Sequence, residues 1–317
     1  MNIKSDCVAD SFILGCWQLD DRSWKATPET DLARAIDTYL AWGVIRFDTA
    51  DIYGRSERIL GRCLKGRPDC QIFTKAVFFD SVPTAKQIQN KIESALRNLQ
   101  RDRLDCIQIH WHDPRLDFTS TLEEFSKYVE RGKIARLGVT NFNTPMLKKA
   151  LQIAPIKSNQ VQYSLIDRRL ENSLQAFCLQ AGIEIFAYGS LAAGFLSDKF
   201  VNVESPLSEK EHARSFYYSN MIAKHGGWEA VRELLLTLDK IAKKYRLSIS
   251  QVALNWLNNR QIVSSIVTGL TNDRQQIKSN MEALKTAIDP EDLEMLSTQS
   301  EELFEQVGDI YSYERGF

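Results

Sequence analysis

The sequence predicts a (β/α)8 barrel, the architecture also called a TIM barrel, and three observations support this prediction. Eight short apolar runs alternate with segments of helical periodicity along most of the chain. At 317 residues, the chain has a usual length for one such barrel. No linker or low-complexity tract divides it, so we assign residues 1–317 to a single domain. A doubly wound open sheet is the alternative, but the sequence lacks the glycine-rich GxGxxG turn that marks nucleotide binding in that fold.

The eight apolar runs give the expected strands in order. They are residues 11–17, 44–49, 71–76, 105–110, 135–140, 158–162, 184–187 and 263–268. Two intervening segments carry apolar stripes, one with Ile88, Ile92, Ala95, Leu96 and Leu99, the other with Leu122, Phe125, Tyr128 and Val129. Thr84, after Pro83, is expected to begin the first of these helices, and Gly132 to cap the end of the second.

Two stretches do not fit the repeating unit. Residues 1–10 precede the first strand and are expected to form a small hairpin or a cap over the bottom of the barrel. Residues 191–247 form a long insertion between strands seven and eight, with a polar aromatic run at 214–220 and an amphipathic helix at 228–245. Long insertions at the C-terminal face of a barrel commonly build or cover active sites. The tail at 309–317 either crosses the barrel mouth or docks on the outer helices.

The composition argues against several classes of function. With 44% hydrophobic and 26% charged residues and no apolar run long enough for a membrane span, we expect a soluble, cytoplasmic protein. A net charge of −1, with acidic and basic residues interspersed, argues against nucleic acid as a partner. The cysteines form no CxxC pair, so we expect free and mostly buried thiols, with Cys16 near a strand end as the exception.

Four chemically distinct residues lie at the ends of successive apolar runs. Asp48 lies at the end of the second run with Tyr53 in the turn after it, Lys75 ends the third, and His110 ends the fourth. In a barrel these strand ends converge on one face. An ammonium stabilises a nearby phenolate, so Lys75 is expected to assist Tyr53 in proton transfer. Asp48 is expected to orient Lys75. His110 is expected to hydrogen-bond a reacting carbonyl oxygen. Each residue alone is more often structural, but their combination predicts a proton-transfer site.

The same residues resemble the motifs of a known family, the aldo-keto reductases. The segments 47–54 (FDTADIYG), 73–75 (FTK) and 109–110 (IH) match the family's tetrad of Asp, Tyr, Lys and His. The resemblance extends from Leu14 to Asn280, which is about the whole domain.

The resemblance implies a function for the tetrad. Tyr53 would be the general acid, supported by Lys75 and Asp48, and His110 would orient the substrate carbonyl. The protein would then be an oxidoreductase that reduces aldehydes or ketones with a nicotinamide cofactor, or oxidises the corresponding alcohols or aldoses.

The resemblance also implies the residues that bind the cofactor. Thr140, Asn141 and Gln160 are expected to hold the nicotinamide carboxamide, and Tyr188 to stack on its ring. The other implied contacts are Gly15, Cys16, Trp17, Asp48, Gly189, Ser190, Leu191, Gly269, Thr271, Arg274, Gln276 and Asn280.

The adenosine end departs from the family pattern. With Asn280 setting the register, Leu270 and Gln276 stand where many relatives carry basic residues. Arg274 or Lys278 is expected to supply the lost charge, because a 2′-phosphate mainly requires a positive, multiply donating partner. We therefore expect NADP(H) as the preferred cofactor, with NAD(H) as the alternative.

Aromatic residues just beyond the strand ends are the candidates for the substrate wall. The expected substrate contacts are Trp17, Trp24, Tyr53, Phe78, Phe79, His110, Trp111 and His112. Such side chains suit a small carbonyl compound or a sugar. The sequence favours no particular oligomeric state.

Two other functions stay open from the sequence. His110 and His112 lie on one side of an extended strand, as in metal-dependent barrel hydrolases, although only His212 and His225 remain to complete a ligand set. A regulatory subunit that binds the cofactor with little turnover is the second alternative, because fold and site do not fix physiological function. No metal site is expected if the reductase prediction holds.

Overall fold

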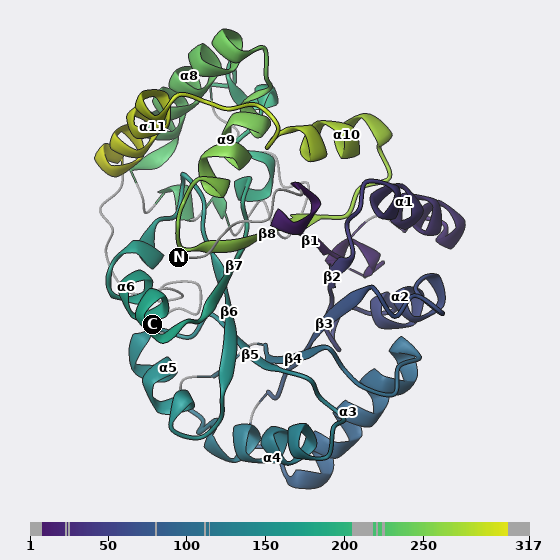
Figure 1. Ribbon diagram of the computed structural model, residues 1–317. Coiled ribbons are helices and arrows are strands. Elements are labelled where there is room, and N and C mark those ends of the chain that lie inside the picture. Colours follow the sequence, from purple (N-terminus) through teal and green to yellow (C-terminus); the bar gives the residue numbers. More distant parts are fainter. Residues whose placement is uncertain are drawn as a thin grey trace.

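Eight parallel strands close into a barrel in chain order, β1-β2-β3-β4-β5-β6-β7-β8, with helices around the outside (Figure 1). The computed structural model describes residues 8–22, 24, 26–79, 81–110, 112–113, 115–204, 218–219, 221–223 and 226–303. The predicted (β/α)8 barrel is confirmed. Residues 1–7 and 304–317 lie outside the described part, so their inclusion in one domain of 1–317 stays a prediction.

The eight predicted strands are all present, with ends shifted by a few residues. They are β1 Phe12–Gly15, β2 Arg46–Asp48, β3 Gln71–Ala76, β4 Cys106–Ile109, β5 Leu137–Thr140, β6 Ile156–Gln162, β7 Glu184–Tyr188 and β8 Val263–Gly269. Their side chains are buried on both faces, since helices cover the outside and side chains fill the inside. That two-sided burial explains why the strands appear in the sequence as continuous apolar runs.

The helices follow the strands as the periodicity predicts. They are α1 Glu29–Ala41, α2 Ser56–Cys63, α3 Ala85–Leu99, α4 Thr119–Glu130, α5 Thr144–Leu151, α6 Ser173–Ala181, α8 Gly227–Tyr245, α9 Ile249–Asn258, α10 Arg274–Glu282 and α11 Pro290–Leu303. Thr84 forms a capping box with Gln87 at the start of α3, as its position suggested. Gly132 follows α4 in a left-handed conformation, and its N–H donates to the carbonyl of Val129.

The interior of the barrel is closed by a packed layer. Its buried side chains are Ile13, Phe73, Cys106, Phe186 and Val267. The rings of Phe73 and Phe186 stack with their centres 5.5 Å apart. Below them, the guanidinium of Arg136 lies 5.4 Å from the Phe73 ring centre and pairs with Glu184. Because this layer fills the barrel, polar side chains further along each strand can face only the mouth.

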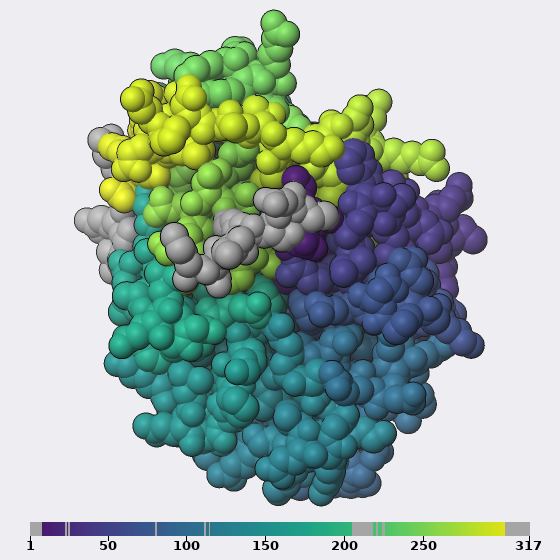
Figure 2. Space-filling model, viewed as in Figure 1, coloured from purple at the N-terminus to yellow at the C-terminus, as the bar shows by residue number. Residues whose placement is uncertain are grey.

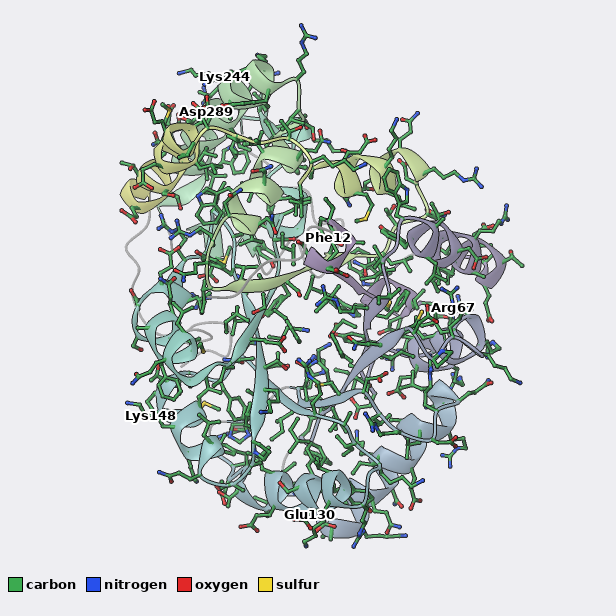
Figure 3. All side chains as sticks on the ribbon, viewed as in Figure 1. Phe12, Arg67, Glu130, Lys148, Lys244 and Asp289 are labelled. Carbon is green, nitrogen blue, oxygen red and sulfur yellow. The ribbon has the colours of Figure 1, made fainter. Side chains whose placement is uncertain are left out.

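The molecule separates apolar and charged side chains as a globular fold requires. Figure 3 shows Phe12 near the centre, whereas Glu130 and Lys148 project from the outer rim. Phe12 is buried, and both charged residues are exposed. Among the described residues, no helix is long and apolar enough to cross a membrane.

The two irregular stretches are described in part. Residues 8–11 form the short 3-10 helix η1 (Val8–Ser11), which packs beside β1 and β8 where β1 begins. The rest of the predicted hairpin or cap, residues 1–7, lies outside the described part. In the insertion, the predicted amphipathic helix at 228–245 is confirmed as α8. Helix α8 packs with α9 and α11, and Figure 2 shows the yellow of α11 beside the green of α8 along one edge of the molecule.

A close approach between α2 and α3 gives the first testable prediction. At Gly61 on α2, a methyl group would overlap the backbone carbonyl oxygen of Asn98 on α3. A backbone atom cannot rotate away, so Gly61→Ala is expected to destabilise the fold by about 1–3 kcal/mol through overpacking. Thermal and denaturant unfolding measure this. Arg58→Ala, at an exposed position of the same helix, is the control and should leave stability nearly unchanged. Equal stability of both variants would show that α2 and α3 do not approach each other as closely at Gly61 as described.

Candidate active site

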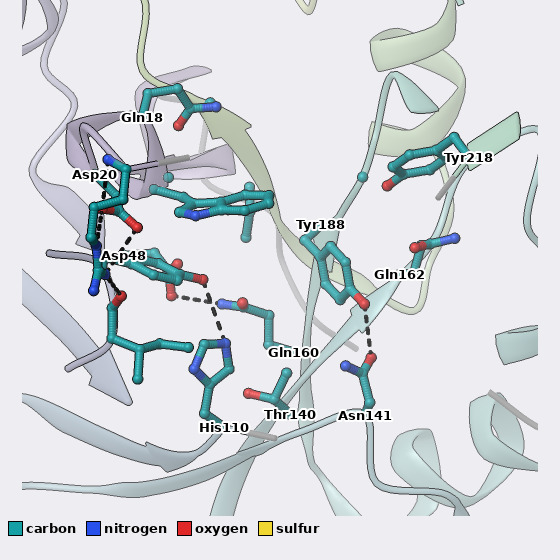
Figure 4. A pocket seen from close by; sticks show the side chains of 18 of the residues that line it. Gln18, Asp20, Asp48, His110, Thr140, Asn141, Gln160, Gln162, Tyr188 and Tyr218 are labelled. Carbon is teal, nitrogen blue, oxygen red and sulfur yellow. Dashed lines mark hydrogen bonds and ion pairs between the residues drawn. The ribbon is translucent and has the colours of Figure 1, made fainter. Parts of the chain in front are cut away.

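The structure brings the four predicted catalytic side chains together at the barrel mouth, where Asp48, Tyr53 and His110 line a cavity and Lys75 lies buried behind them. Figure 4 shows Asp48 and His110 in this cavity. Asp48 is the last residue of β2, and Lys75 lies opposite Gln108 near the end of β3. His110 directly follows β4, and Tyr53 lies in the turn between β2 and α2. The parallel strands end together, so residues far apart in the sequence become neighbours.

Lys75 and Asp48 form a buried ion pair. The side chain of Lys75 is fully buried, and its Nζ lies 2.6 Å from Oδ2 of Asp48. The same ammonium donates to the carbonyl of Thr49 at 2.9 Å. Burial lowers the pKa of Lys75, but the carboxylate of Asp48 and the oxygen of Tyr53 oppose this and hold the pKa above its ordinary value. The ion pair with Asp48 therefore favours the positively charged form of Lys75.

Tyr53 lies between this cation and the cavity. The Nζ of Lys75 is 5.1 Å from the centre of the Tyr53 ring. The phenol oxygen lies 3.5 Å from Nε2 of His110, and the two rings meet edge to face. On its other side, the Tyr53 ring stacks with Trp17 at 6.1 Å between centres. The phenol thus has a fixed cation behind it, and both the phenol and the imidazole reach the cavity.

Gln160 has a contact that the sequence did not reveal. Its amide nitrogen donates to Oδ1 of Asp48 at 2.8 Å. Asp48 therefore has both oxygens engaged, one by Lys75 and one by Gln160. Gln160 still lines the cavity, but part of its hydrogen-bonding capacity serves to orient the carboxylate. Gln160 therefore supports the Asp48–Lys75 ion pair.

The main cavity has a volume of about 700 Å³, within the range of small-molecule sites. A second cavity of about 510 Å³ adjoins it. Residues common to both walls are Gln18, Gly189, Val267 and Gly269. The two cavities therefore adjoin at these residues, and together they offer more room for a dinucleotide than either cavity alone.

The predicted cofactor residues divide between the two cavities. Those on the main cavity are Gly15, Trp17, Asp48, Thr140, Asn141, Gln160, Tyr188, Gly189 and Gly269. Those on the second are Gly189, Ser190, Leu191, Gly269, Thr271, Gln276 and Asn280. Thr140, Asn141, Gln160 and Tyr188, which are predicted to contact the nicotinamide, line the main cavity, and Thr271, Gln276 and Asn280, which are predicted to contact the adenosine, line the second.

Two predicted cofactor residues line neither cavity. Cys16 is buried, and its thiol donates to the carbonyl of Leu14 at 3.3 Å. Burial, together with the negative charge of Asp48, raises the pKa of this thiol well above its usual range, so it is an unreactive thiol. Arg274, at the start of α10, lies instead on a small neighbouring hollow that it shares with Arg34 and Asn272.

The predicted substrate wall is only partly assembled. Trp17, Tyr53 and His110 line the main cavity, and Trp24 lines the second one. Phe79, which is 60% exposed, lies at the mouth of the main cavity. The cavity wall also includes residues that the sequence did not single out, among them Gln18, Asp20, Arg22 and Ile52.

Two other candidates for the substrate wall lie elsewhere, and a third falls outside the described residues. Phe78 lines a separate hollow beside α3, under the ammonium of Lys91. His112 packs against the rings of Phe118 and Phe142. Trp111 lies outside the described residues.

The described residues also bear on the metal-site alternative. Among them, no three His, Cys, Asp or Glu side chains gather in a way that could hold a metal ion. His112 lies in an aromatic cluster, and His212 and His225 lie outside the described part.

An arginine and an aspartate after β1 hold the turn that carries Tyr53. Arg22 donates from Nε and Nη2 to the two oxygens of buried Asp20, at 2.8 and 3.1 Å. Its Nη2 also donates to the carbonyl of Ile52, next to Tyr53 in the chain. This contact fixes the backbone next to Tyr53 and so helps to position its phenol.

Removal of Arg22 is expected to disturb this turn. Arg22→Ala should lower kcat by about ten-fold or more, because small displacements of a catalytic group are costly, while cofactor affinity changes little. Steady-state kinetics and a cofactor titration separate the two quantities. Arg67→Ala is a matched control, since Arg67 makes the same two-residue ion pair with Asp69 far from the site. Equal activity of Arg22→Ala and the control would contradict a positioning role.

Comparison with known proteins agrees with the fold and the site. The sequence profile of the Aldo/keto reductase family matches residues 11–301. The aldo-keto reductase YhdN of Bacillus subtilis (strain 168) is 28% identical over 256 residues, which cover 77% of this chain and 76% of that protein. The NADH-specific methylglyoxal reductase of Escherichia coli (strain K12) is 25% identical over 326 aligned residues, which cover 94% and 97%.

Solved structures share the same barrel. The glycerol dehydrogenase of Gluconobacter oxydans superimposes with a TM-score of 0.80 at 24% identity, over 92% of each chain. An aldo-keto reductase of Klebsiella pneumoniae in complex with NADPH gives a TM-score of 0.70 at 21% identity, over 91% of this chain and 90% of that one. Fold, site and family profile together define an NAD(P)H-dependent oxidoreductase that acts on carbonyl compounds. The chain belongs to the aldo/keto reductase family.

Proposed function

We propose that this protein reduces aldehydes or ketones with NADP(H), or oxidises the corresponding alcohols or aldoses, with Tyr53 as the group that gives or takes the proton. One observation carries the proposal. The phenol of Tyr53 faces a cavity with His110 beside it, and a buried Lys75–Asp48 ion pair lies behind it. Each of these groups has a role in the transfer of a proton to a carbonyl oxygen.

The cavity wall fits a nicotinamide ring. The hydroxyl oxygen of Thr140 is buried at the cavity and has no hydrogen-bond partner among the described residues, so it can bind an amide. The hydroxyl of Tyr188 donates to Oδ1 of Asn141 at 3.3 Å, which fixes the ring that would stack on the cofactor. When bound, the cofactor would supply or accept the hydride.

The proton chemistry follows from the positions of the charges. In the reducing direction Tyr53 gives its proton to the carbonyl oxygen, and the phenolate left behind is stabilised by the ammonium of Lys75. Lys75 keeps its charge throughout, because Asp48 lies 2.6 Å away. The imidazole of His110, whose Nε2 lies 3.5 Å from the Tyr53 hydroxyl oxygen, would hydrogen-bond and orient the carbonyl oxygen. In the oxidising direction the same phenolate is the base.

Mixing the protein with NADPH and a panel of aldehydes tests the proposal. A loss of NADPH absorbance that depends on the aldehyde is expected. Tight NADPH binding without turnover of any carbonyl compound or alcohol would point instead to a regulatory subunit. Failure to bind either nicotinamide cofactor would overturn the proposal.

We also propose NADP(H) as the preferred cofactor, with Arg274 as the partner of the 2′-phosphate. Arg274 is exposed at the N-terminus of α10, and its hollow shares Asn272 with the second cavity. A long exposed arginine can rotate toward a phosphate at that point, where the helix N-terminus also favours negative charge. The cytoplasmic location expected from the sequence stays a prediction.

Parallel fluorescence titrations with NADPH and NADH measure this preference. Arg274→Ala is expected to weaken NADPH binding by about ten-fold and to leave NADH binding nearly unchanged, since only NADPH carries the 2′-phosphate. Lys285→Ala, which removes a lysine that lies over the Trp42 ring, is the control for loss of a positive charge. Wild-type protein that binds NADH as tightly as NADPH would contradict the preference.

A further inference from the structure

Gln162 carries a buried acceptor that the proposed reaction does not use. It is the last residue of β6, it pairs in register with Tyr188 of β7, and it is 2% exposed. Its Nε2 donates to Oδ2 of Asp167 at 2.8 Å and approaches Sδ of Met221 at 2.9 Å. Its Oε1 has no hydrogen-bond partner among the described residues, and Gln162 lines the main cavity.

The orientation of the Gln162 amide is fixed. An ionised carboxylate only accepts hydrogen bonds, so the amide nitrogen of Gln162 must face Asp167 and the amide oxygen must face away from it. Asp167 in turn is held by Arg169, from Nε at 2.8 Å and from Nη2 at 2.6 Å, and both side chains are completely buried. A flip of the amide would set its oxygen against the carboxylate. Oε1 is therefore a fixed acceptor.

Tyr218 places a hydroxyl beside this acceptor. Tyr218 comes from the insertion after β7, is buried and lines the same cavity. A methyl group at Gly189 would overlap the Tyr218 hydroxyl and would also crowd Cγ of Gln162, so the three residues are immediate neighbours. Gly189 moreover has a positive φ of 67°, which L-residues other than glycine adopt at a cost. The glycine is thus required for the phenol to reach this point.

These groups lie apart from the catalytic residues. Figure 4 shows Gln162 and Tyr218 on one side of Tyr188, and Asp48 and His110 on the other. The charge nearest to the amide is neutralised, because Asp167 is paired with Arg169. A neutral donor is therefore preferred over a cation, whose desolvation would be costly. A phenol both donates and accepts, which matches a ligand hydroxyl that does the same.

We propose that Gln162 and Tyr218 form a hydroxyl-binding subsite of the main cavity, in which a ligand hydroxyl donates to Oε1 of Gln162 and meets the Tyr218 hydroxyl. The inference rests on the proposed function, because the ligand is a substrate or cofactor of that cavity. A hydroxyl can come from two sources, either a hydroxylated carbonyl substrate or the ribose of the nicotinamide cofactor. In both cases the subsite favours a ligand that carries a hydroxyl at this point over one that does not.

Two variants remove the two polar atoms with little change in shape. Tyr218→Phe deletes only the hydroxyl, and Gln162→Met replaces the amide by a thioether of similar length. Tyr128→Phe, on the outer helix α4, is the matched control for loss of a tyrosine hydroxyl. Each protein is titrated with NADPH and then assayed with glyceraldehyde and with propanal, which has the same chain length and no hydroxyls.

The result identifies the source of the hydroxyl. A fall of about ten-fold in kcat/KM for glyceraldehyde alone, as expected for one lost hydrogen bond in a buried site, would support substrate recognition. A rise of about ten-fold in the NADPH dissociation constant, with both aldehydes affected alike, would support ribose recognition. If both quantities stay within about two-fold of wild type in Tyr218→Phe and in Gln162→Met, the inference is wrong.

The experiment distinguishes failure of the subsite from failure of the proposed function. Wild-type protein that reduces aldehydes while the variants are unaffected would overturn only the subsite. Wild-type protein that binds NADPH but turns over no carbonyl compound would overturn only the proposed reaction, and the NADPH titrations of the variants would then decide the subsite. Gln162→Met removes a hydrogen bond to Asp167. If that variant does not fold, Tyr218→Phe alone tests the inference.

Discussion

Tyr53→Phe is expected to lower kcat by about a thousand-fold, within the range that general acid catalysis contributes, and to leave NADPH affinity nearly unchanged. The substitution removes only the phenol oxygen that faces His110 and keeps the ring that stacks on Trp17. The hydride donor and the cavity walls stay in place, but the developing oxyanion has no proton to take. Single-turnover kinetics and a fluorescence titration with NADPH measure the two effects separately.

Tyr188→Phe is the matched control for this variant. It makes the same chemical change at another tyrosine of the cavity, where the hydroxyl donates to Asn141 and not to a reacting group. We expect Tyr188→Phe to weaken cofactor binding modestly and to retain most of the turnover. If Tyr53→Phe kept turnover comparable to that of Tyr188→Phe, Tyr53 could not be the proton donor.

Lys75→Met is expected to reduce both activity and stability. Loss of the cation removes the stabilisation of the Tyr53 phenolate, with an expected fall in kcat of about a hundred-fold or more. The variant also leaves the carboxylate of Asp48 buried without its partner, which typically costs about 3–5 kcal/mol of folding free energy. Steady-state kinetics and denaturant unfolding measure the two losses.

The double variant Asp48→Asn/Lys75→Met separates these losses. Without a carboxylate there is no unpaired buried charge, so the double variant should regain much of the stability lost in Lys75→Met and none of the activity. Lys75→Met that is as stable and as active as wild type would contradict both roles of the ion pair.

The pKa of Lys75 also predicts how stability depends on pH. Burial lowers the pKa of Lys75, but the opposing effect of Asp48 and Tyr53 is larger, so the pKa in the folded protein is above that of an unfolded lysine. The folded protein therefore holds this proton more tightly than the unfolded chain does. The stabilisation is complete below the pKa of an unfolded lysine and is lost as the pH rises through the higher folded value. Wild-type protein should thus lose this contribution only in strongly alkaline solution.

Much of the fold and of the grouping of side chains in the candidate site could be predicted from the sequence. Strands buried on both faces are continuous apolar runs, and a closed barrel gathers their ends at one mouth. That geometry was sufficient to place Asp48, Lys75 and His110 together, with Tyr53 in the turn beyond Asp48. Gln162 follows Gln160 by two residues on the same strand, so the alternation of faces could have identified it as well.

Other parts of the site depend on the path of loops. Phe78 and Phe79 are adjacent aromatic residues, and only the course of the chain after β3 decides that Phe79 reaches the main cavity. Tyr218 enters the cavity from an insertion, and no periodicity marks its direction. Arg274 lies at the start of a helix, where the side chain is exposed and its neighbours are set by α1. In each case tertiary packing, and not local sequence, fixes the position of the side chain.

Rapid mixing of an aromatic aldehyde with the NADPH-bound protein tests the central claim most directly, because it observes one round of chemistry without product release. We expect the wild-type complex to oxidise its bound NADPH in a fast first turnover, and the Tyr53→Phe complex, equally saturated with NADPH, to show almost none. A first turnover at the wild-type rate in Tyr53→Phe would show that the proton does not come from this phenol.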